Sequence, residues 1–245
     1  MKFILLGTGS GMPELGKNQS SLYVNVNGKH LLFDCGEGVS KQLLKHHLDN
    51  NVLDAIFISH YHPDHISGLF MLLQMLKIQK REKPLQLFLP ERPAALVETL
   101  QFLYTFIQKF TFPLHILDCE ESELYFEEVN AALTDHLLEY EDLVNENKLP
   151  NLLHSYAFRI SGPEGSLAYT SDINKVDSVQ FLIRDCHTVI IDAQHPEADQ
   201  IIRLQYSGIK RVLLTHSISP KLQAFLFENP IDMFEFAQED ITYFI

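Results

Sequence analysis

Four short apolar runs in this chain each end just before a histidine or an aspartate. The runs cover residues 52–58, 129–133, 167–169 and 212–214, and the polar residues that follow them are His60, His136, Asp172 and His216. Apolar runs of this length between helical patterns predict buried strands alternating with helices, which indicates a mixed α/β fold. Strand ends converge at one edge of such a fold, so we expect these four side chains to lie close together.

The densest cluster follows the first run and reads Ser-His-Tyr-His-Pro-Asp-His over residues 59–65. His60 and His62 can point the same way from an extended turn, while Asp64 and His65 begin a helix after a proline that suits a helix start. Imidazoles and carboxylates in this spacing suit two neighbouring zinc ions, and also suit iron or manganese. The alternative is a polar loop with chance histidines, but a loop gains no stability from groups that repel when protonated.

Composition narrows the class of protein. The 245 residues are 46% hydrophobic, enough for one sizeable core, and we expect a single domain over residues 1–245. A net charge of −13 argues against a surface that holds nucleic acid mainly by neutralising phosphates. Cys35, Cys119 and Cys186 form no C-x-x-C pair, which indicates thiols in a reducing compartment. With no signal-like or membrane-length apolar run, we expect a cytoplasmic protein without a membrane partner.

Five segments together resemble the ribonuclease Z group of the metallo-β-lactamase superfamily. They are the H-x-H-x-D-H pattern from residue 60, Leu6–Pro13, Phe33–Gly38, Ser155–Arg159 and Ala237–Asp240. The resemblance implies a four-layer αββα sandwich, the metallo-β-lactamase fold, with a dinuclear metal site at one edge. It implies two Zn²⁺ ions as cofactors, with Mn²⁺ or Fe²⁺ as alternatives.

Carried over residue by residue, the resemblance implies two metal positions that share one carboxylate. The first is held by His60, His62 and His136, the second by Asp64, His65 and His216, and Asp172 bridges them. His154 is the alternative to His136, because the ribonuclease Z ligand lies only a few residues before the strand at Ser155. We prefer His136, which directly follows a strand. The acidic stretch 139–151 is then a surface loop inserted over the site.

Further residues near these motifs allow two interpretations each. Asp34 and Asp192 are candidates to support a ligand imidazole from behind, and an ordinary turn aspartate is an equally good interpretation of both. His195 is a candidate to replace an accessory catalytic histidine, but a surface histidine at a helix start is the preferred interpretation. Gly7-x-Gly9-x-Gly11 predicts a tight turn that brings backbone close to the site, not a dinucleotide loop, because Met-Pro follows it.

Three departures from ribonuclease Z disfavour a role in tRNA processing. Leu15 stands where the family's 13–18 loop has a basic residue, and we find no lysine-rich insert resembling the arm that grips tRNA. Residues 192–195 read Asp-Ala-Gln-His where ribonuclease Z has His-Glu-Ala-Thr. The metal-binding pattern itself is intact.

These observations predict a dinuclear zinc-dependent phosphodiesterase related to ribonuclease Z. A metal-bound hydroxide would attack a small or short phosphodiester, with Asp64 orienting it or accepting its proton. The alternatives are hydrolysis of a carboxylic ester, lactone or thioester at the same site, or a tRNA 3′-end endoribonuclease. A zinc-binding protein without turnover is disfavoured, because structural zinc sites are closed and usually rich in cysteine. The resemblance also favours a homodimer.

Overall fold

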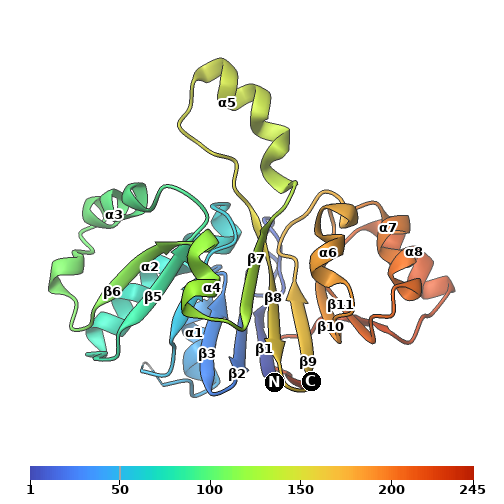
Figure 1. Ribbon diagram of the computed structural model, residues 1–245, viewed down its shortest axis with the longest axis horizontal. Coiled ribbons are helices and arrows are strands. Elements are labelled where there is room, and N and C mark those ends of the chain that lie inside the picture. Colours follow the sequence, from blue (N-terminus) through green and yellow to red (C-terminus); the bar gives the residue numbers. More distant parts are fainter. Residues whose placement is uncertain (50) are drawn as a thin grey trace. The chain divides into compact units, whose positions relative to one another are not determined.

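The computed structural model describes residues 1–49 and 51–245 (Figure 1). The chain forms two compact units, each with its own sheet. Unit 1 comprises residues 1–121 and 238–244, and unit 2 comprises residues 122–237 and 245. A single domain over residues 1–245 stays a prediction.

Unit 1 is built on a seven-stranded sheet in the order β13-β1-β2-β3-β4-β5-β6. Its strands are β1 (Lys2–Gly7), β2 (Ser21–Val26), β3 (Lys29–Phe33), β4 (Ala55–Phe57), β5 (Leu85–Leu89), β6 (Leu114–Asp118) and β13 (Thr242–Phe244). A hairpin at Asn27-Gly28 joins β2 to β3, and both turn residues adopt positive φ as a type I′ turn requires. From β3 to β6 all neighbours are parallel, so the carboxyl ends of β3 and β4 lie at the same edge.

The helices of unit 1 cover one face of its sheet with apolar side chains. They are α1 (Val39–Lys45), α2 (Pro63–Ile78), α3 (Pro93–Phe102) and the 3₁₀ turns at Ile107–Lys109 and Cys119–Glu121. The apolar stripe of α2, formed by Leu69, Leu72, Leu73 and Leu76, is buried in this core. Helical spacing continues past residue 102 in the sequence, but α3 ends there because the chain turns at Tyr104, where φ is +58°.

Unit 2 is built on a six-stranded sheet in the order β12-β11-β10-β9-β8-β7. Its strands are β7 (Val129–Leu133), β8 (Tyr156–Gly162), β9 (Gly165–Tyr169), β10 (Thr188–Ala193), β11 (Arg211–Ile218) and β12 (Phe234–Phe236). Strands β9 to β12 are parallel, so the carboxyl ends of β9, β10 and β11 share one edge. Helices α6 (Gln180–Ile183), α7 (Ala198–Ile202) and α8 (Pro220–Glu228) help to bury the core of this unit, and 3₁₀ turns lie at Val176–Val179 and Arg203–Tyr206.

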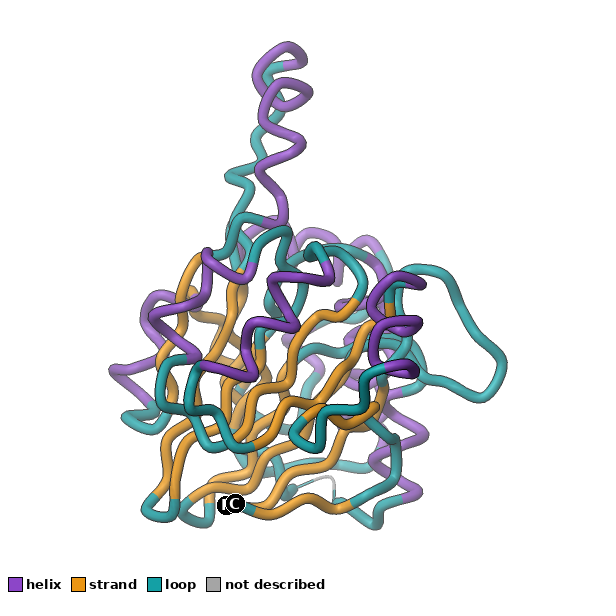
Figure 2. Tube along the Cα trace, turned by 90° about the vertical axis from the view of Figure 1, so that its right-hand side faces the viewer, coloured by secondary structure: helices purple, strands orange, loops and turns teal. Residues whose placement is uncertain are grey.

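The expectation of an irregular loop over residues 139–151 is wrong. Residues His136–Tyr140 form a 3₁₀ helix and Glu141–Asn147 form α5, on a segment that stands away from the sheet of unit 2 (Figures 1 and 2). Every side chain of α5 is at least partly exposed. The helix begins with Glu141 and Asp142 in its first turn, where carboxylates interact favourably with the helix dipole. We call residues 136–153 the arm. Unit 2 also holds α4 (Ser122–Tyr125).

Candidate functional site

The candidate ligands of unit 1 follow the short strand β4. His62 is the N-cap of α2, Pro63 is its first residue, and Asp64 lies in its first turn. His60 and His65 are fully buried and Asp64 nearly so. The His60 ring centroid lies 4.7 Å from that of His62 and 4.2 Å from that of His65. The sharp turn from strand into a proline-started helix therefore gathers these imidazoles, as the sequence pattern predicts.

A buried carboxylate behind this cluster fixes which ring nitrogens carry protons. Asp34 follows β3 and its Oδ1 accepts the Ser59 backbone N–H at 2.8 Å. Its Oδ2 accepts the Ser59 hydroxyl at 3.0 Å and His65 Nδ1 at 2.8 Å. Because the hydroxyl proton of Ser59 points to Asp34, its oxygen accepts a hydrogen bond from His60 Nδ1–H, 3.0 Å away. Both imidazoles then present an Nε2 lone pair, the form that binds a metal.

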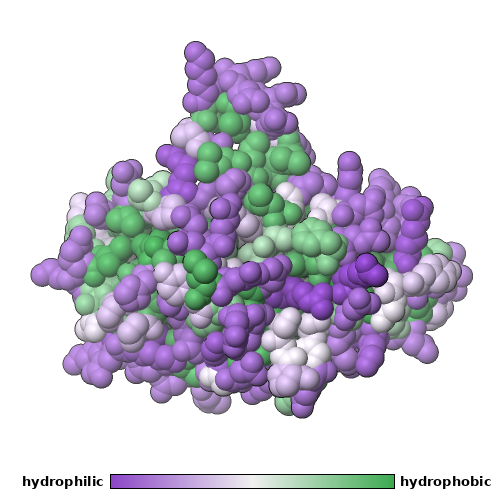
Figure 3. All heavy atoms as spheres, viewed as in Figure 1, coloured by the Kyte–Doolittle hydropathy of each residue, from purple (hydrophilic) through white to green (hydrophobic). Residues whose placement is uncertain are grey.

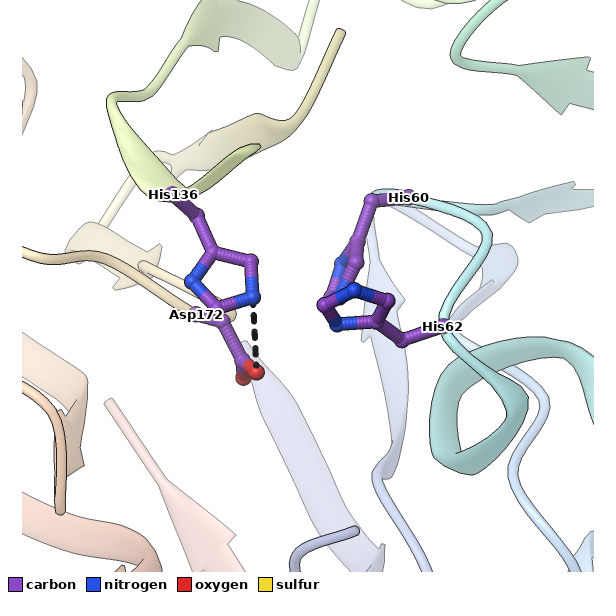
Figure 4. A group of neighbouring side chains, drawn as sticks. All are labelled: His60, His62, His136 and Asp172. Atoms are coloured by element: carbon purple, nitrogen blue, oxygen red, sulfur yellow. Dashed lines mark ion pairs between the residues drawn. The ribbon is translucent and has the colours of Figure 1, made fainter. Parts of the chain in front are cut away.

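The candidate ligands of unit 2 surround one carboxylate oxygen. Asp172 Oδ2 lies 3.5 Å from His136 Nε2 and 3.2 Å from His216 Nε2. Figure 4 shows His136 and Asp172 facing each other, with the ion pair drawn as a dashed line, and the rings of His60 and His62 beside each other on the turn of unit 1. One oxygen of Asp172 therefore lies near both imidazoles.

A bulge in β11 aims His216. Thr215 pairs with Asp192 and Ile218 pairs with Ala193, so His216 and Ser217 are extra residues in the ladder. Both adopt left-handed backbone conformations, with φ of +60° and +61°. Bulges of this kind re-aim a side chain at a strand end, and the strained backbone marks a functional position.

Unit 2 holds one further histidine beside these ligands. The His195 Nδ1 lies 2.7 Å from Asp192 Oδ2, and the His195 ring centroid lies 5.1 Å from that of His136 and 5.2 Å from that of His216. Asp192 is fully buried, while about a third of the His195 side chain is exposed. The hydrogen bond to Asp192 raises the pKa of His195 to about 9, against the lowering effect of burial.

His195 thus lies beside candidate ligands of unit 2, although the sequence favoured a surface histidine at this position. The Asp-x-x-His spacing at residues 192–195 is the signal that points to the pair, because a carboxylate at a strand end readily accepts from a ring three residues on. The two residues proposed as imidazole supports, Asp34 and Asp192, each accept a hydrogen bond from a histidine Nδ1. Asp34 is hydrogen-bonded to the predicted ligand His65, whereas Asp192 is hydrogen-bonded to His195.

His154, the alternative to His136, lies elsewhere in its unit. Its ring stacks edge-on at 6.2 Å from that of Tyr156. His136 instead points its Nε2 at Asp172, and the loops that carry these two residues are joined by Asn174. The Asn174 side chain donates to the backbone carbonyls of Asp135 and His136, and the Asp135 carboxylate accepts the Asn174 N–H at 2.9 Å.

The donor set of both units fits a divalent metal ion. Ligand atoms about 2.0–2.1 Å from one tetrahedral zinc are separated from each other by about 3.3 Å. The three ligand pairs within a unit match this spacing, with separations of 3.4 Å for Asp64–His65, 3.5 Å for His136–Asp172 and 3.2 Å for His216–Asp172. That unit 1 and unit 2 ligands share the same metals stays a prediction.

Comparison with solved structures shows the fold. Human tRNase Z, short form, superposes with a TM-score of 0.74 at 21% identity, covering 100% of this chain and 99% of that one. The metallo-β-lactamase fold protein YhfI from Bacillus subtilis superposes with a TM-score of 0.72 at 20% identity, covering 99% and 98%. The predicted fold class, a mixed α/β metallo-β-lactamase fold, is confirmed.

Sequence relatives place the chain more narrowly. A ribonuclease Z from Shouchella clausii is 37% identical over 175 residues, which are 68% of this chain and 55% of the relative. The chain spans about half the length of the curated relatives it matches. Fold and sequence together define a ribonuclease Z-like protein of the metallo-β-lactamase superfamily.

Within that superfamily a family model matches residues 1–240. The chain belongs to this family, which is described as anti-Pycsar protein Apyc1. Among the described residues, no helix combines the length and the apolar character needed to cross a membrane.

Proposed function

We propose that the protein is a dinuclear zinc-dependent phosphodiesterase acting on a small or short phosphodiester. The ligands would be those predicted from the sequence, with Asp172 bridging the two metals. The observation that carries the proposal is the position of Asp172 Oδ2 between the Nε2 atoms of His136 and His216. A structural zinc site closes around four ligands and has no use for a shared carboxylate oxygen.

Two bound cations would lower the pKa of a water and neutralise charge that develops on the phosphorus. The residues of the chain do the rest. Asp64, at the start of α2, orients the attacking water or accepts its proton. Asp34 and Ser59 bond His65 and His60 at Nδ1, so that Nε2 would be the atom that binds the metal. Without this support the two imidazoles would reorient and lose ligand geometry.

His195 is our candidate for the proton donor to the leaving oxygen. Asp192 orients its ring through Nδ1, and the ring lies beside those of the ligands His136 and His216. The partial exposure of the ring lets a substrate oxygen reach it. A positioned acid of this kind contributes typically about 10²–10⁴-fold to a rate.

The arm argues against tRNA as the main substrate. It carries Glu139, Glu141, Asp142 and Glu146 against the single cation Lys148. A projecting acidic segment repels a phosphate backbone, whereas a tRNA-gripping arm needs lysine and arginine. The family description, which names an anti-Pycsar protein rather than a ribonuclease, agrees with a different substrate.

A substrate panel tests the proposed reaction. Bis-p-nitrophenyl phosphate, a cyclic mononucleotide, a dinucleotide and a precursor tRNA sample phosphodiesters of increasing size, and p-nitrophenyl acetate and a lactone sample the carboxylic alternative. We expect turnover of the smaller phosphodiesters, loss of turnover in Asp172→Ala, and a weak response to tRNA. Hydrolysis of the ester or lactone alone would contradict the proposal and favour the alternative hydrolase.

We also propose a cytoplasmic homodimer. Three free buried cysteines support a reducing compartment. Leu138, Leu143, Leu149 and Leu152 on the arm are each about half exposed, and Figure 3 shows apolar side chains among the polar ones of this segment. Exposed apolar groups gathered on one segment favour a protein partner. Light scattering after size-exclusion chromatography tests this, and a monomer at micromolar concentration would contradict it.

A further inference from the structure

Two sequence motifs that the proposed function leaves unexplained meet in unit 1. One is the glycine-rich segment Leu6–Pro13 and the other is Ala237–Asp240, more than 220 residues away in sequence, of which residues 238–240 belong to unit 1. The first opens the loop of residues 8–20 between β1 and β2, which we call the glycine loop. The second leads into β13, which pairs with β1.

Glu239 joins the two motifs through a single carboxylate. Its Oε1 accepts the Thr8 N–H at 3.1 Å, the Thr8 hydroxyl at 3.3 Å and the Asn18 N–H at 2.8 Å. Its Oε2 accepts the Asn18 side-chain amide at 2.6 Å and that of Gln42 at 3.5 Å. Thr8 and Asn18 are the two ends of the projecting part of the glycine loop. Glu239 therefore closes the base of that loop.

The tip of the glycine loop lies beside Asp64. A Cβ added at Gly11 would sit 3.8 Å from Asp64 Oδ2, in ordinary van der Waals contact, so the space between the Gly11 backbone and this carboxylate is no wider than one methyl group. Two glycines outside the loop pack closely on its base and on the start of α2. A Cβ at Gly38 would meet Asn18 Oδ1 at 2.1 Å, and one at Gly36 would meet the Asp64 carbonyl oxygen at 2.4 Å. There is therefore no room for a side chain at position 36 or 38, beside Asn18 and the Asp64 backbone.

We propose that Glu239 is a positioning residue that holds the glycine loop beside Asp64 and so limits the room in which that carboxylate can turn. The inference rests on the proposed function only for the role of Asp64 as ligand and base. Glu239 acts on Asp64 indirectly, through Thr8 and Asn18. These two residues receive no other explanation from the site chemistry.

The donor pattern explains why a carboxylate is needed here. Two backbone N–H groups, a hydroxyl and two side-chain amides all point at Glu239, and a carboxylate can accept from all of them. In Glu239→Ala these donors lose their acceptor. In Glu239→Gln, Oε1 is retained and the Asn18 amide can turn over to present its oxygen to the new NH₂. Most of the hydrogen bonds between residue 239 and the glycine loop are therefore kept.

The test compares Glu239→Ala with Asp240→Ala as a matched control. Asp240 lies on the same C-terminal segment, but it bonds Lys45 and His46 at the end of α1 and not the glycine loop. In the metal-free protein, amide hydrogen exchange over residues 8–18 should rise roughly 10-fold in Glu239→Ala and stay unchanged in Asp240→Ala. Zinc affinity should fall about 10- to 100-fold in Glu239→Ala alone. In turnover, kcat should fall while KM stays nearly constant.

A charge swap keeps the inference testable if Glu239→Ala fails to fold. Asn18→Asp places two carboxylates in contact and should loosen the loop. Adding Glu239→Gln restores a donor–acceptor pair, so the double variant should recover wild-type exchange and zinc affinity. Unchanged exchange over residues 8–18 in Glu239→Ala, or an equal effect of Asp240→Ala, would overturn the inference. Absence of phosphodiesterase activity in the wild type would refute the proposed function, while the exchange and zinc arms would still decide this inference.

Discussion

Asp34→Asn should disable the metal ligands of unit 1 while preserving the shape of the site. The oxygen of the introduced amide must stay where Oδ1 is, because the Ser59 backbone N–H can only donate to it. The new NH₂ then faces His65 Nδ1 and the Ser59 hydroxyl, which now have to accept. His65 is driven to the tautomer with its proton on Nε2, and Ser59 can pass the same change on to His60. An Nε2–H cannot bind a metal.

The expected loss of metal affinity follows from one hydrogen bond. To return His65 to the tautomer with a lone pair on Nε2, the new hydrogen bond between the introduced amide and His65 Nδ1 would have to be broken. A hydrogen bond to a charged group contributes about 1.5–3 kcal/mol, which is roughly 10- to 100-fold in metal affinity. Zinc affinity, measured by competition with a chromophoric chelator, should fall by that factor. In the metal-free variant, imidazole ¹⁵N shifts should show the proton of His65 moved from Nδ1 to Nε2.

Ser59→Ala is the matched control, since it removes the hydroxyl but keeps the Asp34–His65 bond. It should leave the His65 tautomer unchanged and weaken zinc binding less than Asp34→Asn does. Wild-type zinc affinity in Asp34→Asn, with His65 Nε2 still unprotonated, would refute the reasoning about the buried carboxylate.

Three other variants follow from the structure. Asp64→Ala should lower kcat by about 10³-fold or more, because it removes the proposed base and a ligand together, and wild-type turnover would contradict the mechanism. In the metal-free protein, His195 should titrate near pH 9 by NMR. Asp192→Asn removes the largest cause of that raised pKa and should bring the pKa of His195 down toward or below 6.5. A wild-type His195 that loses its proton below pH 7 would exclude the hydrogen bond between His195 and Asp192. Phe57→Ala should lower the free energy of unfolding, measured in urea, by about 3–5 kcal/mol. Phe57 is fully buried, and its ring stacks at 4.8 Å on that of Phe33 and at 4.6 Å on that of Phe88. A loss under about 1 kcal/mol would show that this stack is not part of the core.

The ligand types could be predicted from the sequence because they are set by local patterns. His60, His62, Asp64 and His65 lie within six residues, and the turn into α2 gathers them without help from distant segments. Asp172 and His216 follow the parallel strands β9 and β11, so one rule about strand ends places them at an edge. His136 follows β7, which runs in the same direction as β9 because both are antiparallel to β8.

What the sequence could not predict depends on contacts between distant residues. The direction of the His216 side chain depends on a two-residue bulge with positive φ. Neither bulge residue is a glycine, so the sequence carries no sign of this backbone conformation. The hydrogen bond from the Thr8 N–H to Glu239 joins two residues that are 231 positions apart in the sequence. α5 is missed for a different reason, because a short polar helix on an exposed arm has no buried face and leaves no apolar periodicity to detect.

The central claim is that two metal ions support phosphodiester hydrolysis in this protein. The most direct measurement is a zinc titration of the metal-stripped protein, followed through the initial rate of bis-p-nitrophenyl phosphate hydrolysis. We expect no hydrolysis without metal and a rate that reaches its plateau at two zinc ions per chain. A rate that is unaffected by metal removal, or that saturates at one ion per chain, would contradict it.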